Sequence, residues 1–175
     1  MSNISMTTSK RNAIVTVMLI SAFVSMLNQT ILNTALPAII KGLNITETTA
    51  QWLITGFMLV NGIMIPLTAF LMDKYSTRHL YIFSMAIFLL GSIVAAFSPT
   101  FSILMISRII QAIGAGILLP LMQFTVFTLF PAEQRGFAMG LAGVVVQSAP
   151  AIGPTLTGLF VDLFSWRLRR SDRQA

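Results

Sequence analysis

Residues 104–120 read L-M-I-S-R-I-I-Q-A-I-G-A-G-I-L-L-P, and they decide the fold. They lie within residues 102–130, a long apolar or uncharged stretch whose single charge is Arg108. A helix rises about 1.5 Å per residue, so a stretch of this length can cross a bilayer with some tilt. An arginine at the centre of such a helix costs about 3 kcal/mol or more. That cost is tolerable where Arg108 faces a polar cavity or a partner, so the stretch predicts a spanning helix with a polar inner face.

The residues after Arg108 give this helix two different faces. Gln111 lies three positions later, on the same face as the arginine. Gly114 and Gly116 follow, and such small residues allow a neighbouring helix to approach closely. The alternative is an arginine near the helix end that extends to the lipid headgroups. We favour the inner polar face because Gln111 continues it inward.

The composition is that of an integral membrane protein. Of the 175 residues, 55% are hydrophobic and only 9% are charged, and the mean hydropathy is +0.84. Soluble domains carry about 25% charged residues. The net charge of +6 comes from basic residues spread over loops and a tail, so nucleic acid is not an expected partner. The chain has no cysteine and no zinc or phosphate-binding motif, so we expect no cofactor, no metal and no enzymatic activity.

Five apolar segments lie between a polar start and a basic end, and they predict an all-α integral membrane fold. The predicted spanning helices cover residues 13–40, 50–72, 80–97, 102–130 and 136–163. We expect residues 1–12 to be a cytoplasmic N-terminal segment and residues 164–175 a basic tail that does not belong to the fold. Thr48 and Gln51 have the spacing of a capping box, which predicts the start of the second helix.

The first apolar segment has one polar side. Residues 13–27 resemble the core of a signal peptide, but no A-x-A-like cleavage site follows and the apolar character resumes at residues 31–40. We therefore predict a spanning helix. Thr30, Asn33 and Pro37 share one side of its second half. They indicate either a helix–helix contact or the lining of a cavity, and Pro37 is predicted to kink or end the helix.

The basic residues predict the orientation of the chain in the membrane. With the N-terminus inside, only Lys41 precedes the tail on the outside. The basic residues on the inside are then Lys10, Arg11, Lys74, Arg78 and Arg135. This distribution predicts a multi-pass protein of the plasma membrane with a cytoplasmic N-terminus. Four more arginines crowd residues 167–173, where five helices place them outside, and this conflict predicts that the chain is an incomplete protein.

Four stretches resemble motifs of the major facilitator superfamily, in particular its fourteen-helix drug:proton antiporter branch. They are L-N-Q-T-I-L-N-T-A-L-P at 27–37, A-F-L-M-D-K-Y-S-T-R at 69–78, L-x-x-x-R-x-x-Q-A-x-G at 104–114 and G-P-T-L-T-G at 153–158. Trp166 and Arg167 begin a W-R-W-like ending. The resemblance extends over about residues 25–167, and it implies most of one six-helix half of such a transporter.

The resemblance also implies roles for individual residues. Arg108 is similar to the family's arginine linked to proton coupling, and a fixed cation can tie the protonation of a nearby carboxylate to conformation. With Gln111, Thr30 and Asn33 it makes up the predicted proton-coupling site and polar cavity. Whether Thr30 and Asn33 line a cavity or only contact a helix is left open by their spacing.

Two further motifs are implied to have roles in conformational change. Asp73, Lys74 and Arg78 resemble a gating turn, where a carboxylate near a helix end latches one conformation. The alternative is a solvated turn that only sets the topology. The helix-five motif that marks antiporters is matched by Gly153, Pro154 and Gly158. This motif acts either as a hinge or as plain helix packing.

The sequence departs from the family pattern at several positions. Asn28 stands where much of the branch has aspartate, so this residue cannot carry a proton. Small residues replace motif glycines at Ala69, Ser76, Ala112 and Thr157. After Arg167 the family's W-[IL]-F is replaced by leucine and arginine, which resembles a truncation or frameshift junction.

The resemblance implies the front part of a proton-driven multidrug efflux transporter, an antibiotic-resistance protein. Its expected partners are the lipid bilayer, protons and lipophilic or cationic small-molecule drugs. We expect this chain alone not to transport. The alternative is a membrane protein with a structural or interaction role. The 153–158 motif disfavours an importer, and an intramembrane protease is disfavoured by the single histidine and by Asp73 and Asp162, which lie near opposite faces of the membrane.

Overall fold

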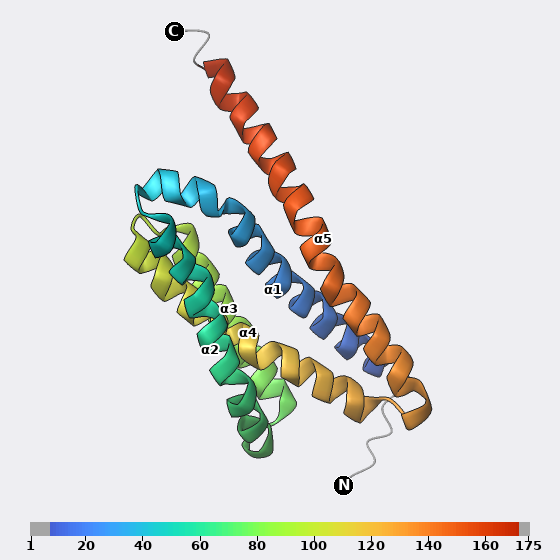
Figure 1. Ribbon diagram of the computed structural model, residues 1–175. Coiled ribbons are helices and arrows are strands. Elements are labelled where there is room, and N and C mark those ends of the chain that lie inside the picture. The colour runs from blue at the N-terminus through green and yellow to red at the C-terminus, as the bar shows by residue number, and fades with distance from the viewer. Residues whose placement is uncertain (1–7, 172–175) are drawn as a thin grey trace.

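The described part of the chain is entirely helical. The computed structural model describes the backbone of residues 8–171 and the side chains of residues 8–155. The helices in this range are α1 (Thr8–Leu43), α2 (Glu47–Lys74), α3 (Thr77–Ala96), α4 (Phe101–Leu129) and α5 (Ala132–Ser171) (Figure 1). Each is long and apolar enough to cross a bilayer, the fifth within Ala132–Thr155. The predicted all-α membrane fold with five spanning helices is confirmed.

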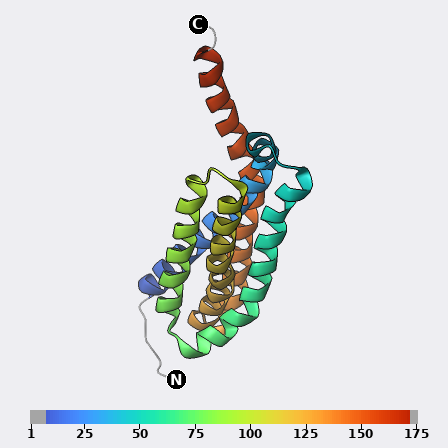
Figure 2. The ribbon, with the colours of Figure 1, turned by 90° about the vertical axis from the view of Figure 1, so that its left-hand side faces the viewer.

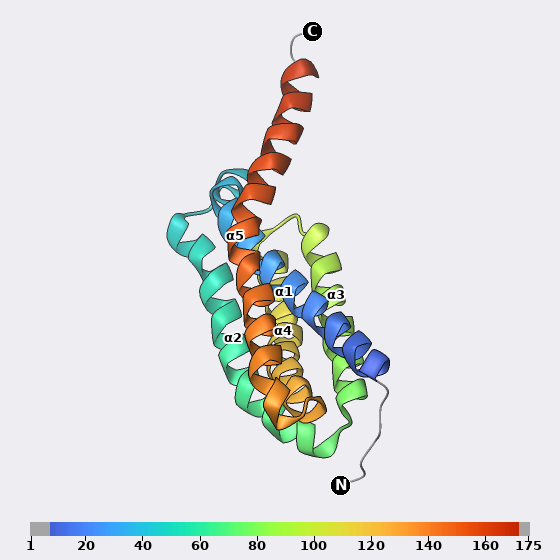
Figure 3. The same cartoon turned by 90° about the vertical axis from the view of Figure 1, so that its right-hand side faces the viewer.

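α4 is the centre of this bundle, because it contacts each of the other four helices. α2 and α3 pack against α4, whereas α5 packs mainly along α1 (Figure 1, Figure 3). The start of α1, the α2–α3 turn and the α4–α5 turn lie at one end of the bundle (Figure 2). The α1–α2 and α3–α4 connections lie at the opposite end. The fold therefore gathers Arg11, Lys74, Arg78 and Arg135 at one end of the bundle.

The starts of the first two helices differ from the predicted boundaries. α1 begins at Thr8, so the last residues of the expected segment 1–12 are helical. α2 begins at Glu47, after the extended N-cap residue Thr46, whose side chain accepts a hydrogen bond from the Thr49 backbone N at 3.2 Å. The predicted capping box of Thr48 and Gln51 is wrong, because this earlier threonine already satisfies the free amide of the first turn.

The end of α5 also differs from the prediction. The helix was expected to end at residue 163 and a basic tail to follow over residues 164–175. Instead it continues to Ser171. Residues 159–171 contain neither proline nor glycine, so no residue there ends the helix. Residues 172–175 lie outside the described residues.

Pro37 does not end α1, although the sequence allowed either a kink or an end. The helix continues through Pro37 to Leu43, and Figure 1 shows it curved in its second half. Pro66 and Pro120 likewise lie inside α2 and α4. Proline leaves a backbone carbonyl of the preceding turn without its helical hydrogen bond. Spanning helices tolerate this because neighbouring helices and side chains provide another partner for that carbonyl.

The core lies along α4, where small residues bring the neighbouring backbones close. A Cβ atom on Gly114 would lie 2.7 Å from the Ser84 carbonyl oxygen of α3. A Cβ atom on Gly116 would lie 2.5 Å from the Cβ atom of Met64 in α2. Beyond these positions, Ile117 and Leu121 are fully buried in the main apolar cluster. The predicted packing face of this helix is confirmed, and it is this close packing that places α4 at the centre.

Candidate functional site

Arg108 lies inside the bundle, in the middle of a polar contact between α1 and α4. Its side chain is 1% exposed. Its Nη1 donates to Gln111 Oε1 at 2.9 Å and to Asn28 Oδ1 at 3.3 Å. The guanidinium carbon lies 4.6 Å from the centre of the Phe57 ring. The inner polar face is confirmed, and the alternative of an arginine that extends to the lipid headgroups is wrong.

Gln111 continues the polar contact from α4 to α3. It is 2% exposed, and its Nε2 donates to Ser92 Oγ at 3.0 Å. Ser92 in turn donates to the Phe88 carbonyl oxygen at 2.9 Å. Hydrogen bonds therefore connect three helices through four side chains. We call this set the polar chain, and its members are Asn28, Ser92, Arg108 and Gln111.

The close approach of α3 to Gln111 depends on Gly91. A Cβ atom at this position would lie 2.7 Å from Gln111 Cγ and 2.8 Å from the Gln111 backbone N. Any larger residue would push the two helices apart at the level of the hydrogen bond to Ser92. Neither Gly91 nor Ser92 was singled out from the sequence. Their signal is a small-residue pair in an otherwise bulky apolar segment.

The charge of Arg108 has no counterion in the described part of the chain. Each of its hydrogen-bond partners is a neutral amide, and its Nε and Nη2 are buried without a partner. Buried charges are normally paired, and an unpaired one is costly. The Phe57 ring offsets part of this cost, since cation–π contacts contribute about 2 kcal/mol where they are desolvated. Asn28 departs from the family pattern in the sequence, and in the structure this residue is a hydrogen-bond partner of Arg108.

Thr30 and Asn33 do not join the polar chain. Thr30 Oγ1 donates to the Met26 carbonyl oxygen of its own helix at 3.0 Å. Its side chain packs against α5, where a Cβ atom on Gly153 would lie 2.6 Å from Thr30 Cγ2. Asn33 is exposed one turn further along α1. The predicted cavity set therefore separates into a buried pair on α4 and two α1 residues that lie elsewhere.

A buried amide near α4 was missed from the sequence. The Asn61 Oδ1 atom of α2 is buried and has no hydrogen-bond partner. It lies beside Gly116, where an added Cβ atom would be 2.9 Å from this oxygen. An isolated asparagine in an apolar segment is the signal that could have found it.

The residues of the expected gating turn are exposed at the α2–α3 connection. Asp73, Lys74 and Arg78 all face outward. Lys74 Nζ lies 4.7 Å from the centre of the Phe70 ring. The hydroxyl of Ser76 hydrogen-bonds His79 Nδ1 at 2.6 Å. The structure thus brings the three residues to one turn at the end of the bundle, and their gating role stays a prediction.

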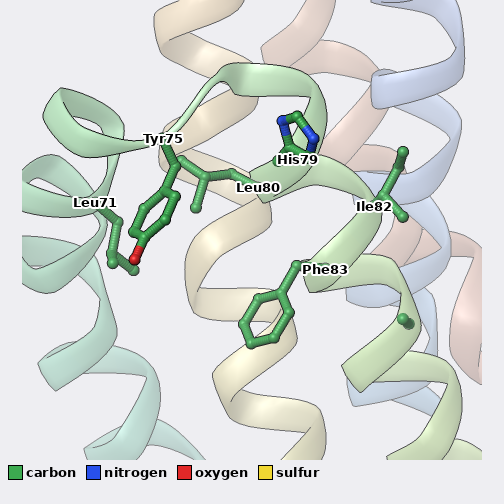
Figure 4. Close-up of a pocket in the computed structure, with 7 residues that line it drawn as sticks. Leu71, Tyr75, His79, Leu80, Ile82 and Phe83 are labelled. Atoms are coloured by element: carbon green, nitrogen blue, oxygen red, sulfur yellow. The ribbon is translucent and has the colours of Figure 1, made fainter.

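An apolar groove of about 680 Å³ lies next to this turn. Figure 4 shows lining side chains on both sides of the turn, with Leu71 from α2, Tyr75 from the turn itself, and Leu80 and Phe83 from α3. Its lining is almost entirely apolar, so it offers no set of polar groups that would orient a small molecule.

The helix-five motif is only partly described. Gly153 is buried against Thr30, and Pro154 is exposed. Gly158, Trp166 and Arg167 lie outside the residues whose side chains are described. α5 passes through Pro150 and Pro154 as one continuous helix, so the motif forms a close helix contact at Gly153, and its hinge role stays a prediction.

A second, smaller cavity lies between α4 and α5. Its volume is about 230 Å³, and Met122, Gln123, Met139 and Gln147 are among its lining residues. Gln123 and Gln147 are exposed although they lie within spanning helices. Polar side chains in such positions normally face a bundle interior or a water-filled path rather than lipid. Sequence reasoning missed both glutamines.

Metal chemistry finds no support in this part of the molecule. Across residues 8–155, no group of three or more histidine, cysteine or acidic side chains could hold a metal ion. What the site offers instead is a fixed buried cation, neutral hydrogen-bonding side chains and closely packed helices. Such features are typical of the interior of a helical membrane protein.

Comparison with known proteins identifies the class. The family model of the Major Facilitator Superfamily matches residues 18–168. The chain belongs to the Major Facilitator Superfamily. The family recognised from the four motifs is therefore confirmed, and so is the expectation of a transporter-family protein rather than an enzyme.

Particular relatives refine this assignment. The chain is 55% identical over 157 residues to the uncharacterized MFS-type transporter YcnB of Bacillus subtilis. The matched region covers 90% of this chain and 33% of the relative. It is 45% identical to the lincomycin resistance protein LmrB of Bacillus subtilis, over 85% of this chain and 31% of the relative. It is 36% identical to the probable multidrug resistance protein EmrY of Escherichia coli, over 84% of this chain and 29% of the relative. The chain thus spans about a third of the length of these relatives.

Proposed function

We propose that this chain is the N-terminal part of a proton-driven multidrug efflux transporter of the fourteen-helix drug:proton antiporter branch. In its complete form this transporter exports lipophilic or cationic drugs across the plasma membrane. The observation that carries the proposal is the buried, uncompensated Arg108 in the polar chain. Relatives named for lincomycin and multidrug resistance support the choice of cargo.

The proposed role of Arg108 is to couple proton binding to conformation. A fixed cation lowers the proton affinity of any carboxylate that comes close, so a carboxylate near Arg108 holds its proton only in the conformation that separates the two. Asn28 occupies the contact where an aspartate would do this, and an amide does not titrate. In this transporter the proton is therefore carried by a carboxylate outside the polar chain.

The proposed role of the α2–α3 turn is to latch one conformation. Asp73 is exposed at the end of the bundle, where it is free to meet the partially positive N-terminus of a helix from the other half. Lys74 and Arg78 flank it and keep this end on the cytoplasmic side. Labelling of Thr77→Cys from the outside of intact cells would contradict this orientation.

The chain alone is proposed to transport nothing. Alternating access in this kind of transporter moves one half against the other around a central site. The described helices supply most of one half, and they leave Asn33, Gln123 and Gln147 exposed. The alternative of a structural or interaction protein without transport is favoured by no specific observation.

The proposal is tested by comparing this chain with a complete version of the transporter in cells that lack their main drug pumps. The complete version should export a lipophilic cation such as ethidium in a manner abolished by collapse of the proton gradient. The chain alone should match the empty vector. Gradient-dependent export by the chain alone would instead indicate a small transporter that works as an oligomer.

A further inference from the structure

Two arginines that are far apart in the sequence contact one residue, Phe130, where α1, α4 and α5 come together. The guanidinium carbon of Arg11, in the first turn of α1, lies 4.4 Å from the centre of the Phe130 ring. Arg135, in the first turn of α5, donates from Nε to the Phe130 carbonyl oxygen at 3.0 Å. Its guanidinium carbon lies 4.2 Å from the centre of the Phe127 ring. We call this group of four side chains the arginine corner.

Most hydrogen-bond donors of the arginine corner are unused. A guanidinium has five N–H donors. Arg135 uses its Nε in the bond to Phe130, and Arg11 uses its Nε in a 3.5 Å contact with Asn12. The Nη donors of both residues have no hydrogen-bond acceptor in the described part of the chain. The aromatic contacts restrict where the two guanidinium groups lie and leave these donors available to a ligand.

The two charges of the arginine corner also lack a carboxylate. Neither Arg11 nor Arg135 forms an ion pair with an acidic side chain within residues 8–155. Glu133 lies in the first turn of α5 and is exposed. Two cations gathered around one residue repel each other, and an anion between them removes that repulsion. An arginine with free Nη groups matches the oxygens of a phosphate, which it binds in a bidentate manner.

The surroundings of the arginine corner favour a lipid as the source of that phosphate. The corner lies at the ends of three helices that are long and apolar enough to span a membrane, and helix ends of this kind lie near the headgroups. Phe127 of the arginine corner is 55% exposed, and Phe137, two residues after Arg135 on α5, is 78% exposed. Exposed rings at this level are suited to acyl chains, whereas a soluble anion makes no use of them.

We propose that the arginine corner is a binding site for the phosphate of an anionic phospholipid, whose acyl chains cover Phe127 and Phe137. The bound lipid would tie α1, α4 and α5 together at this end of the bundle. The proposal concerns this chain's own residues and does not rest on transport.

Quenching by brominated lipids tests the proposal on the full chain in phosphatidylcholine vesicles. The reporter is Phe137→Trp in a background of Trp52→Phe and Trp166→Phe. Brominated phosphatidylglycerol should reach half-maximal quenching at a mole fraction on the order of tenfold lower than brominated phosphatidylcholine, because each basic residue near an anionic surface strengthens binding about fivefold. Arg11→Gln with Arg135→Gln should remove this preference. Arg11→Gln alone, which keeps the bond between Arg135 and Phe130, should reduce it to an intermediate value.

The matched control removes two other basic residues from the same end of the bundle. Lys74→Gln with Arg78→Gln lowers the net charge by the same amount and should keep the tenfold preference. Excess inorganic phosphate should leave the quenching unchanged. Equal quenching by the two lipids in the parent chain would overturn the proposal. An equal loss of preference in the control variant would show only general surface charge, and competition by inorganic phosphate would replace the lipid with a soluble anion.

Discussion

α3 and α4 lie side by side and are both apolar enough to span a membrane, yet they have opposite environments. The outward side of α3 carries large apolar residues, including Phe83, Leu89 and Leu90, each more than half exposed. α4 instead buries Arg108 and Gln111. Hydropathy therefore identifies a spanning helix, whereas the placement of its polar and small residues indicates whether it faces lipid or the inside of the bundle.

The largest effect is expected from removing the buried charge of α4. Arg108→Ala in a complete version of the transporter should lower proton-driven dye efflux by about tenfold to a hundredfold, the usual range of a coupling free energy between two sites. Arg108→Lys should retain part of the activity, because lysine keeps the charge but not the planar stack on Phe57 or the paired hydrogen bonds. Initial efflux rates at matched expression provide the measurement.

The matched variant for Arg108 lies on α3. Leu89→Ala shortens a side chain that is 59% exposed, and it should leave efflux unchanged. Normal export by Arg108→Ala at normal expression would remove the coupling role. Equal losses in both variants would point to general destabilisation rather than to coupling.

The next largest effect concerns the contact surface between the two helices. Gly114→Leu should destabilise the chain by about 3 kcal/mol or more, because overpacking a closed contact forces backbone shifts. An added Cβ atom alone would lie 2.9 Å from the Phe88 backbone N. Ala86→Leu adds the same side chain to the exposed side of α3 and should change stability by less than about 0.5 kcal/mol. Unfolding in mixed micelles of increasing sodium dodecyl sulfate content compares the two, and equal destabilisation would contradict the lipid-facing position of Ala86.

The comparison of α3 and α4 also shows what the sequence could predict. The spanning segments were predictable because the backbone N–H and C=O groups of an apolar segment in hydrocarbon must hydrogen-bond within that segment. A single segment can do this only as a helix. The burial of Arg108 was predictable because a charge in lipid is too costly and because Gln111 extended its face. These inferences needed only local spacing.

Partners from other helices were not predictable in the same way. Nothing in the local sequence indicates that Asn28 of α1 reaches Arg108, because their contact depends on how two helices cross. The same holds for Ser92 and Gln111. The capping error at α2 had a local cause, since several neighbouring threonines offered equivalent caps and only the backbone conformation selected Thr46.

A moderate effect is expected when the polar chain receives a carboxylate. In the parent chain, Arg108 Nη1 donates only to amide oxygens. Asn28→Asp places a negative charge against this nitrogen. The present bond from Arg108 to the neutral amide lies toward the lower end of the range of about 1.5–3 kcal/mol for hydrogen bonds to charged groups, and a bond to a carboxylate lies toward the upper end. The variant should therefore resist unfolding better than the parent by about 1 kcal/mol. The complete transporter with this change should still export, since the branch pattern that residues 27–37 resemble has aspartate at this position.

Asn33→Asp provides the control for this variant. Asn33 is exposed on the same helix, so its charge has no buried cation to meet and should not raise stability. A stability gain of equal size in both variants would indicate a general charge effect. Total loss of export in Asn28→Asp would show that the neutral amide is required in this transporter.

The smallest effect is expected at Ser92, the residue of α3 that accepts a hydrogen bond from Gln111 in the polar chain. Ser92→Ala leaves Gln111 Nε2 without its acceptor and should cost about 0.6 kcal/mol, the typical value of an interhelical hydrogen bond in a membrane protein. Ser84→Ala is the matched change, because Ser84 is buried on the same helix but donates only to the Tyr81 carbonyl oxygen within it. Its removal should cost close to nothing, since that oxygen keeps its helical hydrogen bond. A double-mutant cycle of Ser92→Ala with Gln111→Ala isolates the contact, and a coupling energy of zero would show that the polar chain ends at Gln111 and that α3 contributes packing alone.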